Sequence, residues 1–147
     1  MKQRRSALKV GAVMTAAPVT ITSADSLKTA FDLLTKHNVR ELPVVENDRL
    51  IGIVTDRDLR QVAPSYPLFR HEEEIRSYMD DLKVASAMTP DPLVVTPETA
   101  VVEAAELLRT YRVNSLPVVK ENRLVGIISV TDLLKLFIEQ NEGAATA

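Results

Sequence analysis

The sequence predicts an α/β (α+β) fold made of two similar halves, each with the element order β-α-β-β-α. Three observations lead to this prediction. They are an internal repeat, the same succession of apolar periodicities in both copies, and a composition of 46% hydrophobic, 26% charged and 4% aromatic residues, which is typical of globular proteins. A chain of 147 residues holds one ordinary domain or two very small ones. We therefore expect the two halves to pack together.

The internal repeat has an offset of 74 positions and aligns residues 14–59 with 88–133 without a gap. Of the 46 aligned pairs, 18 are identical. A unit of this size is too small to bury a core alone, which is why we expect the copies to fold against each other. The identical pairs include Pro18/Pro92, Leu42/Leu116, Pro43/Pro117, Gly52/Gly126 and Asp58/Asp132.

Each copy begins with a short apolar strand and an amphipathic helix. The strands are expected at 19–21 and 93–95, each behind a proline, which suits the start of a strand. Apolar residues then recur at i, i+3, i+4 and i+7, the spacing of one helix face, so both stripes should face the core. The stripes are Leu27, Ala30, Phe31 and Leu34 in the first copy, and Val101, Ala104, Ala105 and Leu108 in the second.

A hairpin and a final helix complete each copy. Apolar runs at 42–45 and 50–54 flank Asn47 and Asp48, which suit a tight turn. The second copy repeats this pattern around residues 121–122, and the final helices are expected to begin at Thr55 and Ser129.

The copies are joined by a segment with a break at 63–67 and a polar helix predicted over 71–82. The acidic run 72–74 is interpreted as a solvated helix face. We thus expect domain 1 at 8–62, a linker at 63–83, domain 2 at 84–139 and a flexible tail at 140–147.

Charge and composition weigh against several classes of partner. With 18 basic and 20 acidic residues the formal net charge is −2, which gives no broad field to attract nucleic acid or an anionic membrane. Cysteine is absent, as expected for a protein of the reducing cytoplasm. No apolar run reaches the length of a signal peptide or a membrane span. We expect a cytoplasmic protein that binds neither nucleic acid nor membrane.

Catalysis is also not expected. The histidines His37 and His71 have neither metal-ligand spacing nor a nucleophile motif beside them. The four glycines form no phosphate-cradling loop. The sequence therefore predicts no enzyme, no catalytic or metal-binding residue and no required cofactor.

The segments Thr55-x-x-Asp58 and Ser129-x-x-Asp132 allow two interpretations. In the first they are capping boxes, in which hydroxyl and carboxylate each accept a hydrogen bond from a backbone amide at the helix start. In the second the same geometry binds a ligand, because exposed amides attract phosphate and a carboxylate accepts hydrogen bonds from ribose hydroxyls.

The segments 39–45 and 52–58, matched by 113–119 and 126–132, resemble the hallmarks of CBS (cystathionine β-synthase) domains. The resemblance covers about residues 10 to 138. The chain is similar to stand-alone bacterial CBS pairs (Bateman modules), including acetoin-utilisation-type proteins. It implies tandem CBS domains with pseudo-two-fold symmetry. It also implies a sensor that binds an adenosine-containing small molecule, namely AMP, ADP, ATP or S-adenosylmethionine.

Carried over by position, the resemblance implies two nucleotide-binding clefts. Arg57 is either a phosphate contact or a solvated helix charge, and the replacement of Arg57 by Thr131 in the other copy predicts that the clefts differ. The first cleft would join Thr15, Pro18, Thr20, Arg40, Glu41 and Leu42 to Ser129, Thr131 and Asp132; the second would join Thr89, Pro92, Val94, Asn114, Ser115 and Leu116 to Thr55, Arg57 and Asp58.

The resemblance also implies a homodimer. The alternative function is a non-catalytic dimerisation or docking scaffold with vestigial nucleotide sites, which would bind an unidentified target protein. Leu134, Phe137 and Ile138 could supply the apolar surface for it, although core packing also explains them.

Overall fold

The computed structural model describes residues 7–62 and 72–145. The chain divides into two compact units, of which unit 1 is Met1–Pro18 with Leu93–Ala147 and unit 2 is Val19–Pro92. Each unit combines helices with a three-stranded sheet, which confirms the predicted α+β fold class.

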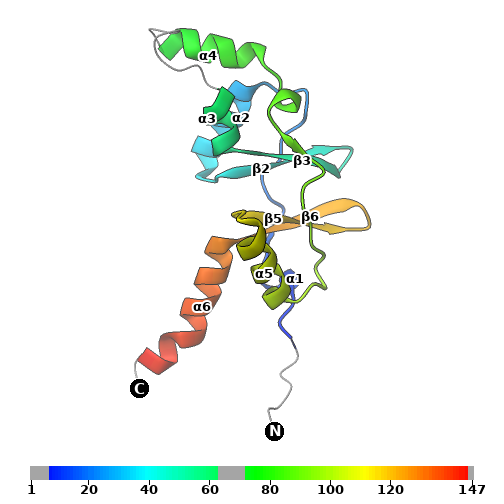
Figure 1. Ribbon diagram of the computed structural model, residues 1–147, viewed down its shortest axis with the longest axis vertical. Helices are drawn as coiled ribbons and strands as arrows, with labels where there is room; N and C mark the ends of the chain where they lie inside the picture. Colours follow the sequence, from blue (N-terminus) through cyan, green and yellow to red (C-terminus); the bar gives the residue numbers. More distant parts are fainter. Residues whose placement is uncertain (1–6, 63–71, 146–147) are drawn as a thin grey trace. The chain divides into compact units, whose positions relative to one another are not determined.

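In unit 2, the helices lie on one face of an antiparallel sheet with strand order β2-β3-β4 (Figure 1). Its elements are α2 (Leu27–His37), β2 (Glu41–Glu46), β3 (Arg49–Thr55), α3 (Asp56–Val62), α4 (Glu72–Asp81), the 3-10 helix η1 (Val84–Ser86) and β4 (Thr89–Pro90).

Unit 1 repeats this plan with the antiparallel strand order β1-β6-β5, and its last helix extends away from the sheet (Figure 1). Its elements are α1 (Val10–Val13), β1 (Thr15–Ala16), α5 (Val101–Tyr111), β5 (Ser115–Lys120), β6 (Arg123–Ser129) and α6 (Val130–Ala145).

The repeats exchange their first segments. Strand β1 precedes the first repeat's helix but pairs with β6, and β4 precedes the second repeat's helix but pairs with β3. Glycine permits this close approach, because a Cβ at Gly126 would lie 2.9 Å from the carbonyl oxygen of Thr15, and one at Gly52 would lie 2.9 Å from that of Thr89. The glycines of the repeat are thus required by backbone contact with the exchanged strand.

Each unit has its own hydrophobic core, and the exchanged segments contribute to both. Of the predicted helix stripes, Phe31 departs from expectation: it is 49% exposed, because it lies at the edge of the apolar arc of α2. The buried core of unit 2 is Ile21, Leu27, Ala30, Leu34, Leu42, Val44, Val54, Leu59, Met79 and Val84. That of unit 1 is Val10, Val95, Ala104, Leu108, Leu116, Val118 and Ile128.

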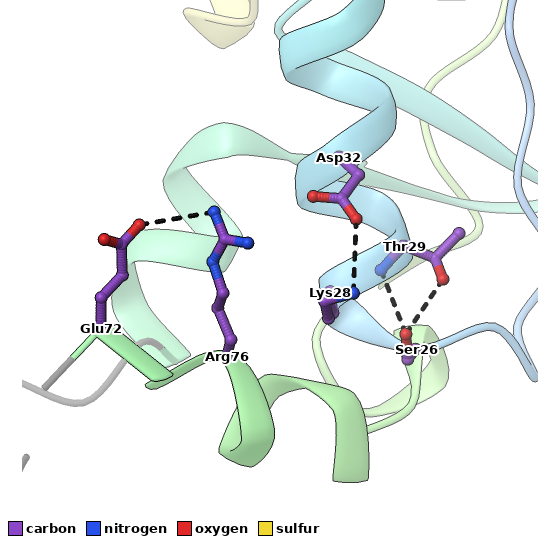
Figure 2. A network of polar contacts seen from close by, with 6 residues as sticks. All are labelled: Ser26, Lys28, Thr29, Asp32, Glu72 and Arg76. Atoms are coloured by element: carbon purple, nitrogen blue, oxygen red, sulfur yellow. Dashed lines mark hydrogen bonds and ion pairs between the residues drawn. The ribbon is translucent and has the colours of Figure 1, made fainter. Parts of the chain in front are cut away.

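The start of α2 is fixed by a side-chain cap. The hydroxyl oxygen of Ser26 accepts a hydrogen bond of 3.1 Å from the backbone N–H of Thr29 and also contacts the Thr29 hydroxyl (Figure 2). The ion pairs Lys28–Asp32 and Glu72–Arg76 lie at i and i+4 on α2 and α4. These exposed pairs contribute little to stability, so the cap is the stronger determinant of the helix start.

Several boundaries differ from those expected. The apolar segments at 19–21 and 93–95 form only single parallel bridges, Ile21 with Val44 and Val95 with Val118. Helix α6 continues through Ala145, where a tail was expected, because no proline interrupts the run after Ser129. The linker helix is observed as α4, whereas the expected break at 63–67 lies outside the described residues.

The hairpin turns have the left-handed geometry that a two-residue turn requires. In the first repeat the φ angles are 51° at Asn47 and 65° at Asp48, and in the second 52° at Glu121 and 65° at Asn122. All eight non-glycine residues with positive φ in the described chain form four such matched pairs; the other four residues are Ala17, Asp91, Asn38 and Arg112. Backbone conformation is therefore repeated even where residue type is not.

We expect Glu121→Asn to stabilise unit 1. Asparagine tolerates the left-handed region better than glutamate, so the free energy of unfolding should rise by about 0.5–1 kcal/mol. Urea denaturation measures this change, and Asn47→Glu is the matched control that should lower the stability by a similar amount. Equal stabilities for the wild type and both variants would contradict the assigned turn geometry.

Candidate functional site

Polar side chains gather where the second hairpin strand of each unit runs into a helix. In unit 1 they form the Asp132 cluster, defined as Thr15, Ser129 and Asp132. In unit 2 they form the Asp58 cluster, defined as Thr55 and Asp58. Both aspartates are half-buried.

In the Asp132 cluster the carboxylate accepts three hydrogen bonds. The backbone N–H and the hydroxyl of Ser129 donate to Oδ2 at 2.9 and 3.0 Å, and the hydroxyl of Thr15 donates to Oδ1 at 3.3 Å. In return the backbone N–H of Asp132 donates to Ser129 Oγ at 3.1 Å. Strand β1 supplies Thr15, so the exchanged segment reaches this cluster directly.

The Asp58 cluster has the same frame with fewer contacts. The backbone N–H of Thr55 donates to Asp58 Oδ2 at 2.8 Å, and the backbone N–H of Asp58 donates to Thr55 Oγ1 at 3.1 Å. Within the described residues Oδ1 of Asp58 has no hydrogen-bond partner. Both units thus contain the hydrogen bonds of a capping box. These bonds do not occupy every acceptor position of the carboxylates, so the ligand-binding interpretation remains compatible with them.

Backbone carbonyls of the segment before each Leu-Pro pair tie it to the helix start. The N–H of Asp56 donates to the carbonyl of Arg40, and the N–H of Val130 to that of Asn114, both at 2.9 Å. The family resemblance predicts Arg40 and Asn114 as site residues. The role of their carbonyls could not be predicted from the sequence, because every residue type carries the same backbone carbonyl.

Acceptor capacity separates the two clusters. An ionised carboxylate has about four acceptor positions. Asp132 uses three of them and Asp58 uses one, so Asp58 can accept further donors without losing a protein contact. Arg57 is exposed and has no ion pair in the part of the chain that the structure describes, whereas the neighbouring Asp56 is paired with Arg60 at 3.4 Å.

The predicted cleft residues fall into both units, and their combination into clefts stays a prediction. The side chains of Leu42 and Leu116 are fully buried in their own cores, so any ligand contact there would be through the backbone. Unit 1 holds Thr15, Pro18, Val94, Asn114, Ser115, Leu116, Ser129, Thr131 and Asp132, and unit 2 holds Thr20, Arg40, Glu41, Leu42, Thr55, Arg57, Asp58, Thr89 and Pro92.

Other kinds of site find no support in the described residues. No group of three or more histidine, cysteine, aspartate or glutamate side chains is placed to hold a metal ion. His37 is exposed, and His71 lies outside the described residues. None of the described helices combines the length and apolarity needed to cross a membrane.

Comparison with known proteins gives one consistent match. The family model described as CBS domain matches twice, at residues 10–65 and 84–139. A CBS domain-containing protein of Dictyostelium discoideum is 39% identical over 122 residues, which are 82% of this chain and 84% of that protein. Inosine-5'-monophosphate dehydrogenase of Aquifex aeolicus is 35% identical over 121 residues, but this chain spans only 22% of its length.

Solved structures agree with this match. AcuB of Vibrio cholerae, described as an acetoin utilization protein, is 29% identical with a TM-score of 0.78, covering 96% of this chain and 98% of that one. CBSX2, a CBS-pair protein from Arabidopsis thaliana, has been solved in complex with AMP; that structure is 29% identical with a TM-score of 0.76, covering 90% and 98%. The chain belongs to the CBS domain family, as a pair of CBS repeats.

Proposed function

We propose that this chain is a regulatory sensor that binds an adenosine-containing nucleotide and performs no catalysis. AMP is the first ligand to test, because the related CBSX2 has been solved in complex with AMP. ADP, ATP and S-adenosylmethionine are the competing ligands of the same class.

The observation that carries the proposal is the spare acceptor capacity of Asp58. Ribose presents two neighbouring hydroxyl donors, and an ionised carboxylate accepts both through charge-assisted hydrogen bonds. The capping contact with Thr55 holds this carboxylate in place before any ligand arrives, so little side-chain entropy is lost on binding.

The phosphate requires a separate contact. Arg57 is next to Asp58 in sequence, and its exposed guanidinium can form bidentate hydrogen bonds to phosphate oxygens. The carboxylate of Asp56 would repel phosphate, but its pairing with Arg60 reduces that repulsion. The Asp132 cluster has Thr131 in place of Arg57. Its carboxylate already uses three of about four acceptor positions, so to accept both ribose hydroxyls it must give up a protein contact, such as the 3.3 Å contact with Thr15. We therefore expect tighter nucleotide binding at the Asp58 cluster.

Isothermal titration with the four ligands tests this function. We expect Asp58→Ala and Asp132→Ala each to weaken one class of site by about 10- to 100-fold, since a hydrogen bond to a charged group contributes about 1.5–3 kcal/mol. Asp25→Ala is the matched control, because Asp25 accepts the same kind of local bond, from Thr22 N–H at 2.9 Å. It should leave binding unchanged.

A thermal shift measurement supplies an independent readout. A ligand that binds only the folded protein raises its stability by about 2.7 kcal/mol at a hundredfold excess over Kd. If none of the four ligands shifts the melting temperature, the sensor proposal fails. Unchanged isotherms for both aspartate variants would remove these carboxylates from the site.

The second candidate function is a dimerisation scaffold, and α6 favours it. Leu134, Phe137 and Ile138 lie on one side of this helix and are 57%, 64% and 57% exposed. The charged residues of α6 lie elsewhere around the helix, so this apolar stripe can meet its own copy across a two-fold axis without opposing like charges. We propose a second copy of this chain as its occupant.

We expect Phe137→Glu to convert a dimer into a monomer, because a carboxylate would then be buried without a partner. Light scattering coupled to size exclusion measures the mass in solution. Val102→Glu is the control, since Val102 on α5 is 74% exposed and lies outside the stripe. A wild-type monomer, or a dimer that persists in Phe137→Glu, would contradict this interface.

A further inference from the structure

Two methionines occupy equivalent positions against the glycines that admit the exchanged strands. A Cβ at Gly126 would lie 2.5 Å from the sulfur of Met14, and one at Gly52 would lie 2.8 Å from the sulfur of Met88. Met14 and Met88 are themselves an identical pair of the repeat. Each thioether therefore fills the space that a side chain would need at the facing glycine.

The backbone places each methionine immediately before an exchanged strand. The N–H of Met14 donates to the carbonyl of Val10 at 2.8 Å, and the N–H of Met88 donates to that of Val84 at 2.9 Å. Strands β1 and β4 begin at the next residue and pair with β6 and β3. Because each of these strands has only two residues, few backbone hydrogen bonds hold it. The packing of the preceding methionine is thus a large part of its attachment to the sheet.

These two sulfur atoms differ from the third described one in their access to solvent. Cysteine is absent, and the four methionines are Met1, Met14, Met79 and Met88. Met14 and Met88 are half-buried and pack against the core of their own unit. Met79 is only 7% exposed and belongs to the core of unit 2, and Met1 lies outside the described residues. A small oxidant in solution therefore reaches Met14 and Met88 before Met79.

We propose that Met14 and Met88 are oxidation sites through which a peroxide releases the exchanged strands from their sheets. The sulfur attacks one oxygen of the peroxide, the O–O bond breaks and an S–O bond forms. With hydrogen peroxide the products are methionine sulfoxide and water, so the sulfur loses two electrons and the peroxide gains them. This inference concerns the fold and does not depend on nucleotide binding.

The sulfoxide does not suit the place that the thioether occupies. Its S–O group is polar and accepts hydrogen bonds strongly, and such a group against an apolar core destabilises the folded state unless it finds a donor. The oxidised side chain therefore turns toward water and leaves the glycine.

The consequence differs between the units. In unit 1 the loosened strand carries Thr15, so oxidation of Met14 also removes the hydrogen bond from Thr15 to Asp132. In unit 2 the hydrogen bonds of Asp58 are with Thr55, which β3 supplies, so oxidation of Met88 leaves them in place.

Treatment of the full chain with hydrogen peroxide tests the proposal. Mass mapping of peptides should find one added oxygen at Met14 and at Met88 while Met79 is still unmodified, because Met79 is buried. The oxidised protein should melt about 4–8 °C lower than the untreated protein. Methionine sulfoxide reductases with a dithiol convert the sulfoxide back to the thioether, which should restore the melting temperature.

Leucine is the replacement that resists oxidation at a similar side-chain volume. The double variant Met14→Leu with Met88→Leu should keep its melting temperature in peroxide, and Met79→Leu is the matched control that should respond like the wild type. Hydrogen exchange locates the effect. After oxidation, exchange should become faster only at β1 and β6 in Met88→Leu, and only at β3 and β4 in Met14→Leu.

Three outcomes overturn the proposal. The first is oxidation of Met79 as fast as that of Met14 and Met88. The second is a wild type that is oxidised at both sites and keeps its melting temperature and its exchange rates. The third is a double variant that loses as much stability in peroxide as the wild type. The reductase measurement uses the wild type alone, so a leucine variant that fails to fold does not remove the test.

Discussion

The structure depends on the close approach of an exchanged strand to a glycine in each sheet. Met14 and Thr15 lie over Gly126, and Met88 and Thr89 lie over Gly52. No side chain larger than hydrogen fits there without displacing the neighbouring backbone. Each sheet obtains its third strand from the other repeat, so neither repeat forms its own sheet and core alone. The two copies of the sequence repeat therefore exchange their first strands reciprocally.

The same exchange explains why the two polar clusters are unequal. In unit 1 the strand that passes over Gly126 places Thr15 beside Asp132, and the Thr15 hydroxyl donates a hydrogen bond to that carboxylate. No equivalent hydrogen bond links Thr89 to Asp58 in the described chain. Together with the bond from the Ser129 hydroxyl, the Thr15 contact gives the Asp132 carboxylate two more hydrogen bonds than the Asp58 carboxylate, which changes how much acceptor capacity each aspartate retains. Nearly identical backbones thus hold two clusters with different chemistry, and the differences come from single residues such as Thr131 for Arg57.

Much of this arrangement could be predicted from the sequence. The hairpins, both amphipathic helices and both capping motifs follow from periodicity and turn residues, because those signals are local. Strands β1 and β4 could not be predicted, since two residues have no periodicity and their pairing is set by distant glycines. The exposure of Phe31 could not be predicted for a related reason. The spacing of apolar residues defines one face of a helix, but the elements packed against the helix determine how much of that face is buried.

The candidate site was predicted less completely than the fold. The resemblance selected Asp58 and Asp132, and the structure adds how many bonds each carboxylate makes. Sequence gives no measure of this quantity, because Thr15 and Thr89 are identical and yet differ in contact. The buried hydroxyl of Ser115 has no hydrogen-bond partner among the residues that the structure describes, and this was equally hidden, since a serine beside a Leu-Pro pair is compatible with either a satisfied or an unsatisfied side chain.

The exchange of segments also orders events during synthesis. Unit 2 is continuous in the chain from Val19 to Pro92, so it is complete while the ribosome is still adding β5 and β6. Strand β1 is made before any of unit 2, yet its partner β6 is made near the end, and closing that long loop carries an entropic penalty. The first strand to be synthesised, β1, is therefore among the last to pair with its partner strand.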